Sequence, residues 1–325
     1  MRALQVRELL PDHAGVGLVD LPVPDAGPGE VRVRVRAAAV NFPDLLMTRG
    51  AYQLKPDLPF VPGLEFSGEV DAVGAGVEGW AVGDAVVGGN RFGAMAEYTV
   101  VPATSLRPKP AALGWDAAAA YPVAYLTAYV ALVRCARLEP GEWVLVHGAA
   151  GGVGLATVDL AKALGAREIA AASSADKRAA LERRYAPDAV IDGAPGFRDA
   201  VKTLAGGQGA DVIVDPVGGD IFDESMRCIA FGGRLLVVGF ASGRIPELSA
   251  NMPLIKGFSV VGVRAGEYGR RFPEHGAENV AAVDALAADG RIRPHVHAAL
   301  DLADWCDGLA MLEQREVVGK VVLRP

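Results

Sequence analysis

A glycine-rich turn at residues 147–154, "HGAAGGVG", joins an apolar run to a helical pattern. In the dinucleotide fingerprint G-x-G-x-x-G, the first glycine makes a tight turn, the second lets the backbone approach a pyrophosphate, and the third lets the helix pack closely on the strand. Gly151 and Gly154 hold the second and third places, and Ala149 holds the first, which alanine can fill if its φ angle stays negative. We therefore expect the N–H groups at the helix start to face a pyrophosphate. The expected cofactor contacts are Ala150, Gly151, Gly152, Val153 and Gly154.

The residues after the next apolar run bear on which dinucleotide is bound. NAD sites usually carry Asp or Glu about 20 residues beyond the glycines, but Ser173 and Ser174 stand there, followed by Lys177 and Arg178. A small hydroxyl with nearby cations suits the 2′-phosphate of NADPH, which an acidic residue would repel. In the alternative interpretation, Ser174 caps a helix and the two cations lie on a solvated face; both interpretations can hold at once. We expect NADPH as the cofactor, with contacts from Ser173, Ser174 and Lys177.

The elements that carry these motifs change character near residue 125. Before it, short alternating strands such as "GEVRVRVRAAAV" are separated by proline and glycine, which indicates a β-rich module. After it, apolar runs such as "WVLVHG" and "GRLLVVGF" alternate with helical patterns, which predicts a doubly wound parallel sheet. Alone, the glycine turn could be a mere strand–helix connection, but this βαβ setting favours cofactor binding. The last helix and strand could return to the first module.

Composition excludes several classes of protein. With 325 residues, 51% of them apolar and 22% charged, the chain fits a soluble two-domain globular protein. Its net charge of −7 argues against nucleic-acid binding. Cys135, Cys228 and Cys306 share no metal or redox spacing, so we expect buried thiols and a cytoplasmic location. The uncharged run at residues 117–133 contains Pro122 and is short for a membrane span, so we interpret it as a buried helix and expect no membrane association. The N-terminus lacks the apolar core of a signal peptide.

Five motifs in order along the chain carry a family resemblance. They are "NFPDLLMTRGAY", "PGLEFSGEV", "AAGGVG", "VGFASG" and "GKVVL". Together they resemble the medium-chain dehydrogenase/reductase superfamily and, within it, the zinc-independent quinone oxidoreductases related to ζ-crystallin. The resemblance implies an α/β protein with a GroES-like β-rich catalytic domain, residues 1–124 and 266–325, and a Rossmann NADPH-binding domain, residues 125–265.

The resemblance also allows a test for zinc. Zinc alcohol dehydrogenases of this superfamily hold the catalytic metal through a Cys, a His in a Gly-His-Glu run and a further Cys, positions that correspond here to Asn41, Leu64 and Val123. Apolar Leu64 and Val123 cannot ligate zinc, and the cluster of four structural cysteines is absent from "VVGGNRFGAMAEY". We expect no metal. Without a Lewis acid, the expected reaction is hydride transfer from NADPH to an acceptor that spreads the developing charge itself, a quinone or an α,β-unsaturated carbonyl compound.

Further site residues follow from the resemblance. Asn41 is expected at the nicotinamide end of the cofactor, with Asp44 three residues on, and Tyr52 could donate a hydrogen bond or proton to a developing enolate. The alternatives are a turn residue, a helix cap and a core aromatic, respectively. The other family positions expected to contact the cofactor are Thr127, Gly239, Phe240, Ala241, Val263, Arg264 and Arg315. For Thr127 a hydroxyl bonded to its own helix backbone, and for Arg315 a surface salt bridge, are the alternatives.

The sequence departs from the family pattern at one position near the expected cofactor site, and it leaves two alternative functions possible. Gly193 replaces a tyrosine that in relatives lies near the adenosine phosphate, and Arg183 or Arg184 could compensate. The strand "FSVVGVR", residues 258–264, pairs across a dimer in the family, so we expect a homodimer. The alternative functions are an enoyl-thioester (CoA) reductase and an NADPH-binding protein with little catalysis.

Overall fold

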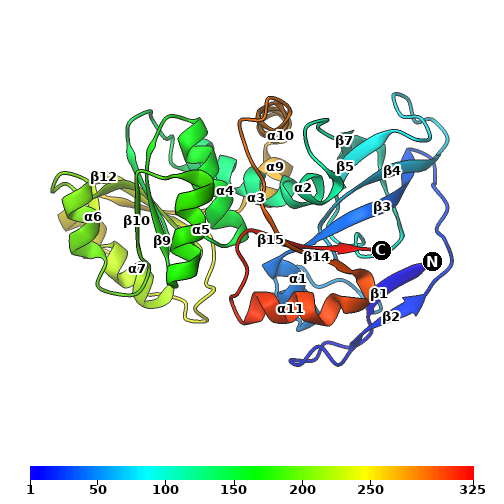
Figure 1. Ribbon diagram of the computed structural model, residues 1–325, viewed down its shortest axis with the longest axis horizontal. Coiled ribbons are helices and arrows are strands. Elements are labelled where there is room, and N and C mark those ends of the chain that lie inside the picture. Colours follow the sequence, from blue (N-terminus) through cyan, green and yellow to red (C-terminus); the bar gives the residue numbers. More distant parts are fainter. The chain divides into compact units, whose positions relative to one another are not determined.

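The chain folds into two compact units. The computed structural model describes residues 1–325 (Figure 1). Unit 1 contains Met1–Val123 and Pro294–Pro325, and unit 2 contains Ala124–Arg293.

The second boundary between the units falls after Arg293, not after Ala265 as the sequence predicted. Helix α10 (Pro273–Ala288) belongs to unit 2, where Arg134, near the start of that unit, donates a hydrogen bond to Asn279 Oδ1 (2.7 Å). This contact joins residues 145 positions apart, so no local sequence pattern reveals it.

Unit 1 is built on a seven-stranded sheet with the order β14-β15-β3-β4-β5-β7, and β6 pairs with β3 outside this path. A separate two-stranded sheet consists of β1 and β2. The long strand β3 alternates as its sequence predicts, since Val31, Val33 and Val35 are buried and Arg34 is exposed. The strands are β1 (Arg2–Val6), β2 (Val16–Asp20), β3 (Glu30–Val40), β4 (Glu65–Val73), β5 (Ala85–Gly89), β6 (Tyr98–Pro102), β7 (Leu106–Pro108), β14 (Val296–Asp301) and β15 (Lys320–Arg324). The helices are α1 (Phe42–Thr48), α2 (Trp115–Ala120) and α11 (Trp305–Glu313), with short 3-10 turns η1 (Ala103–Ser105) and η3 (Leu302–Asp304).

The C-terminal strand completes unit 1. Strand β15 pairs antiparallel with β3 and parallel with β14, as the red and blue arrows of Figure 1 show. In this register Val321 lies opposite Val40, so Lys320 comes next to Asn41, the residue that follows β3. The "GKVVL" motif and the "NFPD" motif, 279 residues apart, therefore meet.

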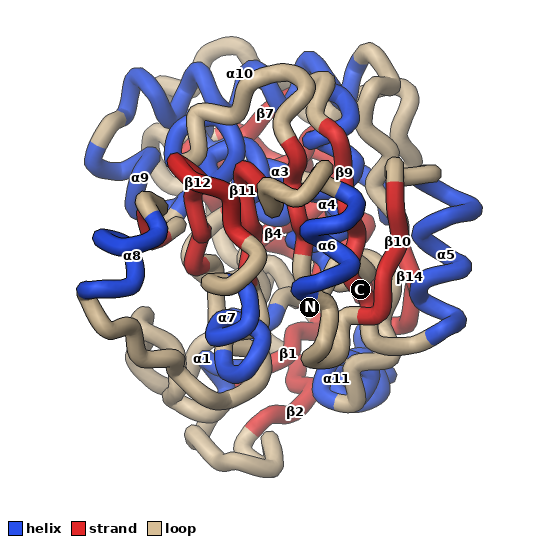
Figure 2. The backbone as a smooth tube through the Cα atoms, turned by 90° about the vertical axis from the view of Figure 1, so that its left-hand side faces the viewer, coloured by secondary structure: helices blue, strands red, loops and turns tan.

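Unit 2 contains a six-stranded sheet in which every pair is parallel, with the order β10-β9-β8-β11-β12-β13. Figure 2 shows β11 and β12 running side by side. The chain moves outward from β8 through β9 to β10, then returns to β11 on the other side of β8, which is the doubly wound order. The strands are β8 (Trp143–Val146), β9 (Arg167–Ala172), β10 (Ala189–Asp192), β11 (Ala210–Asp215), β12 (Ile229–Val237) and β13 (Ser259–Gly262). The helices are α3 (Pro122–Tyr129), whose first two residues belong to unit 1, the π-helical η2 (Val130–Cys135), α4 (Gly152–Ala163), α5 (Ala175–Tyr185), α6 (Arg198–Leu204), α7 (Gly219–Ser225), α8 (Asn251–Lys256), α9 (Ala265–Arg271) and α10.

The uncharged run at residues 117–133 is distributed over α2, α3 and η2, and its Tyr121 and Tyr125 are buried. No helix in the structure combines the length and the apolarity needed to cross a bilayer. Among the cysteines, Cys228 is buried and Cys135 is half-buried, but Cys306 is exposed, so the expectation of three buried thiols is wrong for Cys306. Its exposure depends on how α11 packs, which the local sequence does not determine.

Candidate functional site

The glycine-rich turn lies between β8 and α4, at the carboxyl end of a central strand. The strand order reverses between β8 and β11, and in open α/β sheets ligands bind outside the carboxyl ends of the strands at such a point. Gly148 has φ = +55°, which glycine adopts readily, whereas Ala149 keeps a negative φ and is fully buried. Alanine in the first fingerprint position therefore causes no backbone strain.

Close packing explains the third glycine of the turn. A Cβ atom on Gly154 would lie 2.2 Å from the Gly148 carbonyl oxygen, so any side chain there would push the helix away from the strand. A Cβ on Gly151 would lie 3.3 Å from the same oxygen, which is a milder contact.

The first turn of α4 presents unpaired donors. Gly151 N–H donates to Gly148 O and Leu155 N–H donates to Gly151 O, each at 2.8 Å. The backbone N–H groups of Gly152, Val153 and Gly154 have no acceptor within the chain. Three free donors at the start of a 12-residue helix, with its dipole directed at them, fit a pyrophosphate.

His147, directly before the turn, contributes no charge to this site. Its Nε2 lies 2.8 Å from Ser225 Oγ, and its ring packs against Phe197. Burial lowers the pKa of His147 to about 3, so the imidazole is neutral at physiological pH.

The next strand end carries the residues expected to recognise the adenosine ribose. Ser173 and Ser174 follow β9, and Ser174 Oγ accepts a hydrogen bond from Lys177 N–H at 3.3 Å, so the helix-cap interpretation of Ser174 is confirmed. Arg178 donates from Nη1 to both Ala172 O and Asp192 Oδ2, each at 3.0 Å. The sequence reasoning missed Asp192, because only the pairing of β10 with β9 brings it here.

Gly193 also lies at this edge, and nothing replaces its missing side chain. Its N–H donates to Ala172 O (3.1 Å), and a Cβ on it would lie 3.2 Å from Ala172 N. Arg183 and Arg184 are exposed in the last turn of α5, about 13 Å along the helix axis from Ser174. They are therefore too far from this edge to compensate, contrary to the expectation from sequence.

Loops after β11 and β12 continue the same edge of the sheet. The segment Gly239–Ala241 follows β12, and Ala241 N–H donates to Pro216 O at 3.0 Å. Buried Asp215, which the sequence reasoning missed, accepts from the N–H groups of Val217 (2.8 Å) and Gly218 (2.9 Å) and so fixes the loop after β11. Burial raises the pKa of Asp215, and these two hydrogen bonds oppose that shift.

The remaining residues predicted to bind the cofactor are dispersed. Val263 and Arg264 follow the edge strand β13, and Thr127 is half-buried in α3. Arg315 belongs to unit 1 and follows α11 with φ = +56°.

In unit 1 the predicted catalytic residues Asn41 and Asp44 lie at the start of α1. Asp44 caps the helix, since its Oδ2 accepts from Asn41 N–H (2.8 Å) and its Oδ1 accepts from Gly63 N–H (3.1 Å). It is 1% exposed, and burial raises its pKa to about 7 in spite of these hydrogen bonds. The carboxyl group thus joins α1 to the loop before β4.

Asn41 also belongs to a buried group of polar side chains that we call the Lys320 cluster: Asn41, Asp44, Glu65 and Lys320. Lys320 Nζ donates to Asn41 Oδ1 (2.5 Å) and to Glu65 Oε1 (2.9 Å), and Asn41 Nδ2 donates to Glu65 Oε1 (3.0 Å). Val123 N–H donates to Glu65 Oε2 at 2.8 Å. Glu65 is 0% and Lys320 7% exposed, so the ion pair is buried and its hydrogen-bonding groups are well satisfied.

The Lys320 cluster includes Asn41, one of the three positions that correspond to the zinc ligands of the superfamily, and the other two, Leu64 and Val123, adjoin its Glu65. Asn41 and Val123 both bond to Glu65, and apolar Leu64 precedes it in the chain. No group of three or more His, Cys, Asp or Glu side chains is arranged to hold a metal ion. The sequence did not predict a role for Lys320, although a lysine directly before an apolar strand was the available signal.

Tyr52, the third predicted catalytic residue, is half-buried and packs against the hydrophobic core of unit 1. Its hydroxyl has no hydrogen-bond partner within the chain. The Tyr52 ring is therefore part of the core packing, as the alternative interpretation expected, while its hydroxyl is available to a ligand.

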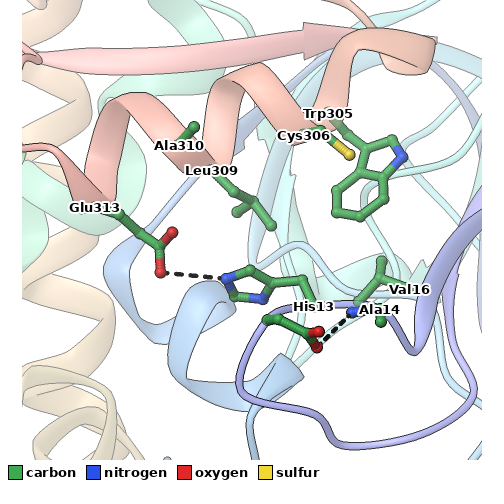
Figure 3. Close-up of a pocket in the computed structure, with 9 residues that line it drawn as sticks. His13, Ala14, Val16, Trp305, Cys306, Leu309, Ala310 and Glu313 are labelled. Carbon is green, nitrogen blue, oxygen red and sulfur yellow. Dashed lines mark hydrogen bonds and ion pairs between the residues drawn. The ribbon is translucent and has the colours of Figure 1, made fainter.

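A pocket of about 410 Å³ in unit 1 contains none of the predicted residues. Its walls include His13, Trp305, Leu309 and Glu313. Figure 3 shows the His13 ring below α11, joined to Glu313 by a contact of 3.3 Å. Its other ring nitrogen lies 2.8 Å from Thr48 Oγ1 at the end of α1.

Comparisons with known proteins define the class. Residues 27–111 match the alcohol dehydrogenase GroES-like domain, and residues 152–284 match the family described as zinc-binding dehydrogenase. A quinone oxidoreductase-like protein 2 homolog from Nematostella vectensis is 40% identical over 91% of this chain and 82% of its own length. The quinone oxidoreductase from Thermus thermophilus, solved also in complex with NADPH, is 34% identical, covers 100% of both chains and has a TM-score of 0.86. A structure described as an NAD-dependent alcohol dehydrogenase is also 34% identical over 100% of both chains, with a TM-score of 0.88.

A GroES-like unit and a Rossmann-type unit with a six-stranded parallel sheet define a medium-chain dehydrogenase/reductase, which confirms the predicted fold class. Within that superfamily the chain belongs to the quinone oxidoreductase-like family and is an NAD(P)-dependent oxidoreductase. The family resemblance inferred from the five motifs is thereby confirmed.

Proposed function

We propose that the protein is a zinc-independent reductase that transfers hydride from NADPH to a quinone or an α,β-unsaturated carbonyl compound. The observation that carries this proposal is the chemistry of the Lys320 cluster together with the two zinc-ligand positions beside it, Leu64 and Val123. Leu64 and Val123 offer no metal-binding side chain, and Glu65 already accepts hydrogen bonds from three groups of the protein. This donor set does not fit zinc. Quinones and enones suit such a site because their conjugation spreads the negative charge that hydride transfer creates.

The residues at the carboxyl edge of the parallel sheet fit NADPH. The free N–H groups of Gly152, Val153 and Gly154 would hold the pyrophosphate, and Ser173 with Lys177 would lie near the ribose 2′ position. The complex of the Thermus thermophilus enzyme with NADPH supports the same choice. When bound, the nicotinamide supplies the hydride, while the protein orients the reactants and excludes water.

Hydrogen bonding restricts what Asn41 can do. Its Nδ2 already donates to Ala39 O (3.3 Å) and Glu65 Oε1 (3.0 Å), so both of its N–H groups are engaged. Oδ1 accepts from Lys320 and retains one lone pair. We therefore assign Asn41 as an acceptor for a ligand hydroxyl, such as that of a ribose, rather than as a donor to the substrate carbonyl. The Tyr52 hydroxyl is then the candidate donor to the developing enolate.

We also propose a homodimer formed through the edge of the parallel sheet in unit 2. Strand β13 pairs only with β12, so its other edge is open. Three large apolar residues of this region are strongly exposed: Phe231 (84%), Leu254 (82%) and Ile255 (72%). An open strand edge with apolar side chains around it favours pairing with a second copy of the chain.

An acceptor panel tests the proposed reaction. We expect the protein to oxidise NADPH with 1,4-naphthoquinone or a simple enone, and to oxidise it only slowly when no acceptor is present. Turnover with enoyl-CoA substrates alone would replace the proposal with an enoyl-thioester reductase. Tight NADPH binding without turnover on any of these acceptors would leave a binding protein with little catalysis.

A further inference from the structure

Two oppositely charged side chains meet where β9 and β10 end. Ala172 and Asp192 are the last residues of these strands and lie opposite each other in the parallel register. Arg178, from the second turn of α5, reaches back so that its Nη1 donates to both Ala172 O and Asp192 Oδ2 at 3.0 Å. A guanidinium from α5 and a carboxylate from β10 therefore lie beside the carboxyl end of β9.

This strand end is where a doubly wound fold distinguishes NADH from NADPH. In such folds a carboxylate at this position accepts a hydrogen bond from the 2′-hydroxyl of NADH, and an arginine nearby accommodates the 2′-phosphate of NADPH. Here Ser173 follows β9, and Asp192 brings a carboxylate to the same place from the neighbouring strand β10. Gly193 adds no side chain that would cover the pair. Solved structures that are 34% identical to this chain include an NADPH complex and a protein described as NAD-dependent, so family membership leaves the cofactor preference open.

We propose that Arg178 and Asp192 form a two-position selectivity switch for the cofactor. Asp192 holds Arg178 when no 2′-phosphate is present and accepts the 2′-hydroxyl of NADH. Arg178 leaves Asp192 to pair with the 2′-phosphate of NADPH, which the Asp192 carboxylate repels. Asp192 therefore limits the preference for NADPH, and Arg178 creates it. This inference rests on the proposed function only in requiring that a dinucleotide binds at the glycine-rich turn.

The exposure of the pair allows such an exchange. The side chain of Asp192 is 57% exposed and that of Arg178 is 26% exposed, and ion pairs of this kind contribute little net stability because water screens them. A phosphate offers arginine stronger, bidentate hydrogen bonds than one carboxylate oxygen does. Separating Arg178 from Asp192 therefore costs little free energy, and the hydrogen bonds of Arg178 with the 2′-phosphate more than offset that cost.

Asp192 has a second contact that makes a conservative test possible. Its Oδ1 accepts a hydrogen bond from Ala194 N–H at 2.9 Å, which fixes the turn after β10. An asparagine can keep this acceptor while it removes the negative charge that faces Arg178. A change in cofactor preference in Asp192→Asn then reports the charge and not a collapsed turn.

The test measures dissociation constants for NADPH and NADH by fluorescence titration of the intact protein. We expect Asp192→Asn to raise the preference for NADPH over NADH about tenfold, the scale of one like-charge contact a few ångströms away in water. We expect Arg178→Gln to lower that preference by at least as much. Glu182→Gln and Arg183→Gln are the matched controls, because they make the same charge changes at exposed positions of α5 whose side chains have no partner.

Each outcome of the titration has a defined meaning. A preference that moves in opposite directions in the two variants, and stays unchanged in the controls, supports the switch. Binding of either cofactor with a preference that stays within twofold of the controls refutes the switch and leaves the proposed function intact. Cofactor binding with the expected shifts but no turnover on any acceptor refutes only the proposed function. Failure to bind either dinucleotide overturns both.

Discussion

Replacing Lys320 with methionine removes the positive charge from the Lys320 cluster and tests whether that cluster stabilises unit 1. Lys320 Nζ makes two hydrogen bonds, to Asn41 Oδ1 and to Glu65 Oε1, in a site that is 7% exposed at the lysine and 0% exposed at the glutamate. Each charge-assisted bond contributes about 1.5–3 kcal/mol, and removal of one partner of a buried pair costs about 3–5 kcal/mol. Glu65 keeps its other two donors, so we expect a loss of about 3 kcal/mol, the lower end of that range.

The assay is denaturant unfolding of the intact protein, monitored by tryptophan fluorescence, to which unit 1 contributes Trp80, Trp115 and Trp305. The double variant Lys320→Met/Glu65→Gln should regain about half of the lost stability, because no uncompensated charge is then buried. Arg36→Met is a control, since its ion pair with Glu69 is partly exposed and should contribute about 1 kcal/mol or less. A loss for Lys320→Met that is no larger than that of Arg36→Met would refute the assignment of a stabilising buried ion pair.

Three further predictions address the cofactor turn, the capping carboxylate and the dimer. Gly154→Ala should weaken NADPH binding at least tenfold, because the new Cβ would lie 2.2 Å from the Gly148 carbonyl oxygen. Gly114→Ala is the control and should leave the affinity unchanged, because nothing lies within 4 Å of its new Cβ. Equal affinities of the two variants for NADPH would contradict the close-packed turn. Because burial raises the pKa of Asp44 to about 7, the folded state holds its proton longer than the unfolded state, so stability should fall as pH rises from about 4 to 7. Asp44→Asn should flatten that fall in unfolding measurements, and an unchanged pH profile would mean that Asp44 ionises normally. Leu254→Asp should convert the proposed dimer to a monomer in sedimentation experiments, and a monomeric wild type would remove the dimer proposal.

Local sequence patterns predicted the parts of the protein that neighbouring residues determine. The glycines of the turn, the alternating strand β3 and the apolar strands of unit 2 each depend on contacts within one strand–helix or strand–turn unit. The buried position and negative φ of Ala149 likewise follow from the turn itself. For these features the spacing of residue types carries the physical constraint directly.

Long-range pairing accounts for what the sequence did not reveal. Lys320 reaches Asn41 only because β15 pairs with β3. The sequence of either strand alone does not determine the register in which two such distant strands pair. Asp192 faces Arg178 only through the pairing of β10 with β9. The acceptor role proposed for Asn41 also depends on such a contact, since Glu65 already accepts a hydrogen bond from its amide.

Oxidation of NADPH by 1,4-naphthoquinone, measured with the protein before and after treatment with a strong chelator, tests whether hydride transfer is independent of zinc. We expect acceptor-dependent oxidation at the same rate in both samples, with no stoichiometric zinc in the untreated protein. Activity that the chelator abolishes and added zinc restores would contradict it.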